Sequence, residues 1–171
     1  GAKGSRVANN TIIADTRELL GGINMVDTGI NNSNTSEVGR FTYEGTVVED
    51  NVIEARNKLI HNGIAMGELV WACRGMTVIP AVVGGTVRDN VTRGDYMGFS
   101  YAANGTRDWT AVGNVDTSIH NVIAGMPCGT TITGPNDGYP MPQGFAFSPE
   151  RALGDFQPEF QPTANLRYNL Q

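Results

Sequence analysis

Charged residues are scarce in this chain of 171 residues. Asp, Glu, Lys and Arg make up 17% of it, against about a quarter in an average soluble domain. Lys3 and Lys58 are the only lysines, the formal net charge is −5 and the pI is near 4.9. Nucleic-acid-binding domains take much of their affinity from Lys and Arg against phosphate. We therefore expect no direct nucleic-acid binding.

Cysteine, histidine and long apolar runs are also in short supply. Cys73 and Cys128 are the only cysteines and His61 and His120 the only histidines, with no cluster at metal-ligand spacing. We expect no metal or cofactor, and the two cysteines are either buried thiols or one pair. No apolar run approaches the ~18 residues of a membrane span, and no signal-peptide core is visible, so no membrane association is expected.

Glycine, asparagine, threonine and serine take the place of the missing charges. Glycine alone accounts for 22 residues, and these residue types favour turns and strand edges over helix interiors. Apolar and polar residues alternate over 41–47 and around 99–112, where Asn104-Gly105 is a typical hairpin turn. The sequence predicts a mainly β protein: a single β-rich domain of the sandwich or barrel type.

One amphipathic helix is predicted near residues 51–62. Val52, Ala55 and Leu59 recur at helical spacing, and Asn62-Gly63 is a typical helix end. We expect this helix to lie on the sheet.

The two ends differ from the middle in composition. Residues 1–10 show no periodicity, and the last part of the chain carries a doubled Phe-Gln-Pro. A proline at every fourth position excludes helix. We predict an N-terminal arm at 1–10, a β-rich domain at 11–154 and an extended C-terminal arm at 155–171. The arm's apolar side chains need a surface, and the predicted contacts to other subunits are Phe156, Phe160, Tyr168 and Leu170.

The nearest approach to a catalytic motif surrounds Cys128. Gly125-Met126-Pro127-Cys128-Gly129 resembles the Gly-x-Cys-Gly nucleophile turn of the chymotrypsin-like cysteine proteases of RNA viruses, whose backbone amides stabilise an oxyanion. His61 is a candidate base, with Asp89 or Asp95 as its orienting carboxylate. However, the glycine stands one position too far from the thiol and the proline removes an amide. We therefore expect a protein that is not an enzyme.

These features favour a non-enzymatic structural subunit of a self-assembling particle, foremost a virus or phage virion protein (capsid, decoration or tail component). Gly1 and Gln171 also resemble the ends that viral chymotrypsin-like cysteine proteases leave on their products. The expected partners are copies of the chain and other particle proteins, and the expected location is the virion, or otherwise a soluble compartment. Two alternatives stay open: a chymotrypsin-like cysteine hydrolase using Cys128 and His61, and a secreted binding module with a Cys73–Cys128 disulfide.

Overall fold

The strands of this protein pair in parallel, each with a strand one winding of the chain away. The computed structural model describes residues 2–27, 42–68, 82–104, 106–120, 145–147 and 152–158. Among these residues every strand pair is parallel. The chain therefore winds as a parallel β-solenoid, in which each winding rests on the one before.

Within the described part of the chain, two six-stranded sheets form the walls of the coil. One has the order β1-β4-β7-β9-β12, with β6 also on β9, and the other has the order β10-β8-β5-β2, with β11 on β8 and β3 on β5. The strands are β1 (Arg6–Ala8), β2 (Thr11–Ala14), β3 (Ile23–Asp27), β4 (Val47–Glu49), β5 (Val52–Glu68), β6 (Val82–Val83), β7 (Thr86–Arg88), β8 (Val91–Asn104), β9 (Thr106–Val112), β10 (Val115–His120), β11 (Phe145–Phe147) and β12 (Ala152–Phe156).

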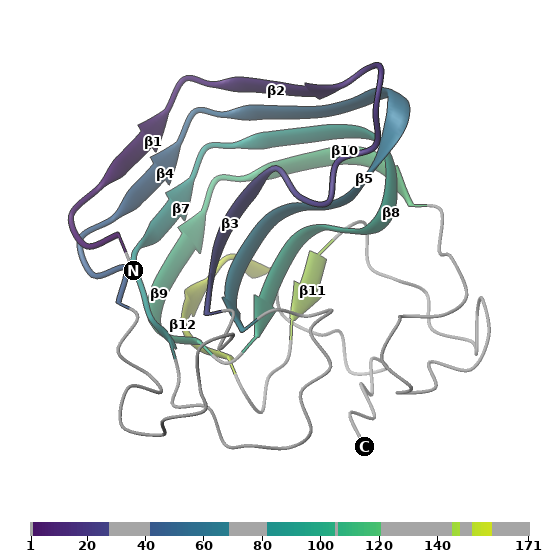
Figure 1. Ribbon diagram of the computed structural model, residues 1–171. Coiled ribbons are helices and arrows are strands. Elements are labelled where there is room, and N and C mark those ends of the chain that lie inside the picture. The colour runs from purple at the N-terminus through teal and green to yellow at the C-terminus, as the bar shows by residue number, and fades with distance from the viewer. Residues whose placement is uncertain are drawn as a thin grey trace, which may run out of the picture.

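Successive windings stack on one another along the axis of the coil. Figure 1 shows β1 and β2 as the outermost line, followed by β4 with β5, β7 with β8, and β9 with β10. Strand β12 lies beyond β9 and starts a further winding. The long strands β5 and β8 bend, because their register shifts between Ala55 and Ile60, so each of them lines two sides of the coil.

The prediction of a mainly β protein is confirmed, but the sandwich or barrel arrangement is wrong. Both of those architectures are typically built from antiparallel strands, whereas here parallel partners come from successive windings. The helix predicted at 51–62 is wrong as well, because Val52 begins β5. Ile53 and Ala55 are buried while Arg56 is exposed, which is the two-residue alternation of a strand. Parallel neighbours on both sides outweigh the weak helical spacing.

The hairpin expected at Asn104-Gly105 is also absent from the described residues. Strand β8 ends at Asn104 and β9 begins at Thr106, but β8 pairs with β5, β10 and β11, whereas β9 pairs with β6, β7 and β12. The chain therefore passes from one sheet to the other between Asn104 and Thr106, and β8 and β9 are not the two arms of a hairpin.

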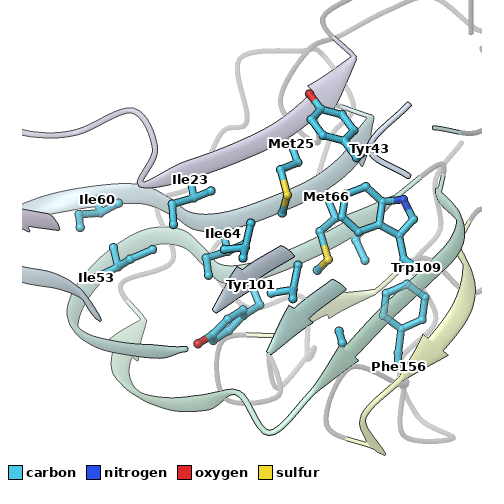
Figure 2. Packing of buried hydrophobic residues seen from close by; sticks show 14 of the residues in the cluster. Ile23, Met25, Tyr43, Ile53, Ile60, Ile64, Met66, Tyr101, Trp109 and Phe156 are labelled. Atoms are coloured by element: carbon cyan, nitrogen blue, oxygen red, sulfur yellow. The ribbon is translucent and has the colours of Figure 1, made fainter. Parts of the chain in front are cut away.

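The core fills the inside of the coil (Figure 2). Trp109 is fully buried, donates its indole N–H to the Val82 carbonyl at 2.9 Å, and lies 5.8 Å from the ring of Tyr43. Gly84 admits this indole, because a Cβ there would lie 2.2 Å from it. Tyr101 donates its hydroxyl to the Asn90 carbonyl at 2.9 Å, and burial raises the pKa of that hydroxyl.

Both segments predicted as arms contribute to the coil. Within 1–10, Arg6–Ala8 forms β1 and pairs with β4. Within 155–171, Asp155 and Phe156 are the last residues of β12 and pair with β9. Residues 159–171 lie outside the described residues.

Candidate assembly site: the corner ladder and the two ends of the coil

The two sheets meet at a tight corner that recurs in four windings. The residue before the turn has a positive φ in each: 57° at Asn9, 54° at Asp50, 55° at Asp89 and 66° at Gly113. Asn, Asp and Gly are the residues that tolerate this left-handed conformation best. The next residue is always an asparagine, at Asn10, Asn51, Asn90 and Asn114. Local sequence therefore fixes the corner.

The corner asparagines form a ladder of hydrogen bonds along the coil. The Nδ2 group of Asn10 donates to Asn51 Oδ1, that of Asn51 to Asn90 Oδ1, and that of Asn90 to Asn114 Oδ1, each at 2.9 Å. The same Oδ1 atoms accept backbone N–H groups of the preceding winding at 3.0–3.2 Å. Asn51 and Asn90 are fully buried. Since unpaired buried amides are costly, the ladder fixes the register between windings.

Gln157 ends the ladder at the C-terminal side. Its Oε1 accepts the backbone N–H and the Nδ2 group of Asn114, each at 3.0 Å, as the next ladder asparagine would do. Its Nε2 also donates to the Asn114 carbonyl at 3.0 Å. In earlier windings this carbonyl position receives the first N–H of the following strand, as Asn90 O does from Val115. Pro158 follows, and proline cannot take the positive φ of the corner. This end of the ladder is capped.

The N-terminal side of the ladder is open. Asn10 is exposed, and its Oδ1 accepts no hydrogen bond from any described residue, although the same atom of Asn51, Asn90 and Asn114 accepts two. Among the described strands, β1 and β2 lie at one edge of their sheets, and β12 and β10 lie at the other. The apolar side chains Val7 and Ile12 stay half-buried there. The first winding thus presents the edge on which another strand can pair.

Ion pairs on the outer face of one sheet tie neighbouring windings together beside the corner. Glu49 on β4 binds Arg6 Nε on β1 at 2.6 Å and Arg88 Nε on β7 at 2.7 Å. These arginines cover the carboxylate, whose side chain is 6% exposed. Hydrogen bonds from Arg88 first, and then from Arg6, lower the pKa of Glu49.

A similar group lies on the other sheet. Glu54 binds Arg56 Nε at 2.9 Å on its own strand and Arg93 Nη2 at 2.8 Å on β8. Hydrogen bonds from Arg56, and then from Arg93, lower the pKa of Glu54 to about 2. Both groups therefore keep their charge across the physiological pH range.

The residues predicted to contact other subunits are placed only in part. Phe156 is 7% exposed and belongs to the core of its own chain (Figure 2), where it continues the inward column formed by Val48, Val87 and Ala111. Its ring therefore packs inside the coil of this chain, and a contact of Phe156 with another subunit stays a prediction. Phe160, Tyr168 and Leu170 lie outside the described residues.

The components of the alternative cysteine hydrolase are not brought together among the described residues. His61 is half-buried on β5, and its backbone N–H donates to the Leu19 carbonyl at 2.9 Å. Asp89 occupies the ladder corner, and Asp95 is exposed on β8. Cys73 and Cys128 lie outside the described residues, so the hydrolase and the disulfide stay untested predictions.

Sequence reasoning missed the ladder, although a signal for it is present. Each corner reads as an apolar residue, any residue, then Asn, Asp or Gly, then Asn, at 7–10, 48–51, 87–90 and 111–114. The asparagines recur at unequal separations of 41, 39 and 24 residues. A search for one fixed period overlooks such a repeat, whereas a search for the four-residue corner would find it.

Comparison with known proteins gives no relative for this chain. Neither the family models, nor the curated proteins, nor the solved structures contain a significant match. No described segment forms a helix that is long and apolar enough to cross a membrane.

Proposed function

We propose that this chain is a non-enzymatic structural subunit of a self-assembling particle, namely a virus or phage virion protein of the capsid, decoration or tail class. Its partners are copies of itself and other particle proteins, and its location is the virion. The observation that carries the proposal is the difference between the two ends of the coil. At the end where β10 and β12 are the last described strands, Gln157 occupies the donors of the last ladder asparagine, whereas at the other end the ladder is open beside the outward edges of β1 and β2.

Parallel strand edges with half-buried apolar side chains are surfaces that pair with further strands. The ladder and the ion pairs hold this surface in one geometry. Less conformational entropy is therefore lost when a partner binds to it. The low share of charged residues, 17%, also supports the proposal, because the centres of subunit interfaces are poor in charge.

Sedimentation velocity and electron microscopy of the purified full chain test this function. We expect concentration-dependent oligomers or ordered particles. A second preparation ending at Pro158 retains the Gln157 cap and removes 159–171, so it separates assembly by the coil from assembly by the tail. A full-length chain that stays monomeric at the highest attainable concentration would contradict the proposal.

A further inference from the structure

We propose that the open edge of the first winding binds a second copy of this chain, end to end, across a two-fold axis at the corner between Asn9 and Asn10. The inference rests on the proposed assembly function and names the surface and the partner. It follows from the inequality of the ends. Head-to-tail stacking needs an uncapped C-terminal corner, and Gln157 with Pro158 occupies that position. The strands at that end, β10 and β12, therefore offer no continuing corner for Asn10, whereas the β1–β2 edge can pair with its own counterpart in a closed, isologous dimer.

The backbone of β1 and β2 offers a consistent set of outward groups. In a parallel pair, successive residues turn their N–H and C=O groups to opposite sides. Val47 N–H binds the Ser5 carbonyl and Asn9 N–H binds the Glu49 carbonyl, so on β1 the residues facing away from β4 are Arg6 and Ala8. Val52 N–H binds the Asn10 carbonyl, so on β2 the residues facing away from β5 are Thr11 and Ile13.

A two-fold axis through the corner brings these groups into register. It lays β1 of one copy antiparallel to β2 of the other, with Ala8 opposite Thr11 and Arg6 opposite Ile13. All four residues turn their N–H and C=O groups outward. The Ala8 carbonyl already accepts Asn10 Nδ2 at 3.1 Å but has a second lone pair, so each opposed pair exchanges both of its hydrogen bonds, as in an antiparallel sheet. The rotation makes the same contacts twice. The exposed Asn10 side chains stay at the rim, where water reaches Oδ1.

The side chains agree with the same register. Val7 and Ile12 both point into the coil, in the columns of Val48 and Ile53, and the rotation sets Val7 opposite Ile12 of the other copy. The contact thereby covers the half-buried Val7 and Ile12 side chains of both copies. On the outer face Arg6 comes next to Ile13, which is 36% exposed and offers no charge to oppose it.

Two variants at Ile13 with opposite charges test this register. Ile13→Glu places a carboxylate opposite the partner's Arg6 and Ile13→Lys places an ammonium there, while both replace the same exposed side chain. Cross-strand pairs are worth ~0.2–1 kcal/mol each, and each occurs twice. We expect the dimer Kd to fall by roughly two- to thirtyfold with Glu and to rise by a similar factor with Lys. If Ile13→Glu and Ile13→Lys shift the dimer Kd equally and in the same direction, the proposed pairing of Arg6 with Ile13 is wrong.

A proline variant tests the backbone contact. Ile13→Pro removes an outward N–H and leaves the bonds to β5, which Ile12 and Ala14 make, and proline is tolerated on such an edge. Analytical ultracentrifugation should show a species of twice 18.3 kDa for the wild type and for the control Ile13→Val, and a monomer for Ile13→Pro with unchanged circular dichroism. If Ile13→Pro unfolds, the Glu and Lys pair decides alone.

The outcomes separate this inference from the proposed function. If oligomers form but their mass and Kd are the same for the wild type and all three Ile13 variants, the end-to-end dimer is wrong and the assembly function still stands. Open-ended polymers of the wild type point to head-to-tail growth and also overturn the dimer. A monomer at every concentration overturns both proposals.

Discussion

Replacing Asn90 by alanine should test the ladder most directly, because this side chain makes five hydrogen bonds inside the coil. Its Oδ1 accepts the backbone N–H and Nδ2 of Asn51, and its Nδ2 donates to Val48 O, Arg88 O and Asn114 Oδ1, at distances of 2.9–3.1 Å. Alanine leaves the buried backbone N–H of Asn51 without a partner. The other groups that lose a bond to Asn90 either keep another hydrogen bond or are carbonyl oxygens that can accept one elsewhere.

The magnitude follows from this difference. An orphaned buried N–H costs ~1–3 kcal/mol, and each of the four other lost bonds contributes ~0.5 kcal/mol or more. The total loss in free energy of unfolding should be at least ~3 kcal/mol, a large share of the ~5–15 kcal/mol that is usual for a domain. Asn10→Ala is the matched control, because Asn10 is exposed and water can replace its bonds; it should cost ~1 kcal/mol or less.

Urea denaturation followed by far-UV circular dichroism measures both variants. The midpoint should fall much further for Asn90→Ala than for Asn10→Ala, with a similar slope if unfolding stays two-state. Equal losses would refute the reasoning, since they would mean that burial in the ladder adds nothing to a corner asparagine.

Three further predictions follow from the same geometry. The pKa of Glu54 is lowered to about 2 from 4.5, so its ion pairs should stabilise the fold fully above pH 4.5 and lose that effect as the pH falls towards 2; melting temperatures across this range should decline less steeply for Glu54→Gln. Gly94→Ala should destabilise by more than ~2 kcal/mol in urea, because φ is +90° and the new Cβ would lie 2.0 Å from the Ala55 carbonyl oxygen. The control Gly4→Ala, with φ +67° and open space, should cost only the ~1–2 kcal/mol of a left-handed residue, and an equal loss would contradict the steric argument. Gln157→Ala should free the Asn114 amides, cost ~1–3 kcal/mol and speed proteolysis within β12; unchanged proteolysis would show that Gln157 is not a cap.

The β character of the chain could be predicted from sequence, but the direction of pairing could not. Alternating apolar residues and abundant Gly, Asn and Thr identify strands, and they do so equally for a sandwich and for a solenoid. Residues 51–62 show the limit clearly. Val52, Ile53, Ala55 and Leu59 fit a helical face as well as a bent strand, and parallel neighbours contributed by residues about 40 positions away decide between them.

The site was harder to predict than the fold class. Phe156 was correctly seen as an apolar residue that needs a surface, but sequence alone did not show that its own coil supplies that surface. The cap depends on the length of one side chain, because Gln157 reaches Asn114 from the position directly after the Phe156–Ala111 pair. No composition or spacing rule distinguishes that glutamine from one in an exposed tail.

The ladder corner is also the part of each winding whose length does not vary. The register matches Arg6 with Val47, Thr86 and Thr110, and Ala14 with Ala55, Gly94 and Ser118, so these strand–corner–strand runs are equally long. The ladder separations of 41, 39, 24 and 43 residues therefore differ through residues that enter elsewhere. An extra residue between Arg6 and Ala14 would turn inward side chains outward and would also shift the edge that faces a second copy. Insertions away from the corner change neither the inward side chains nor the edge formed by β1 and β2. This explains how a chain with such unequal windings keeps a continuous edge along these two strands.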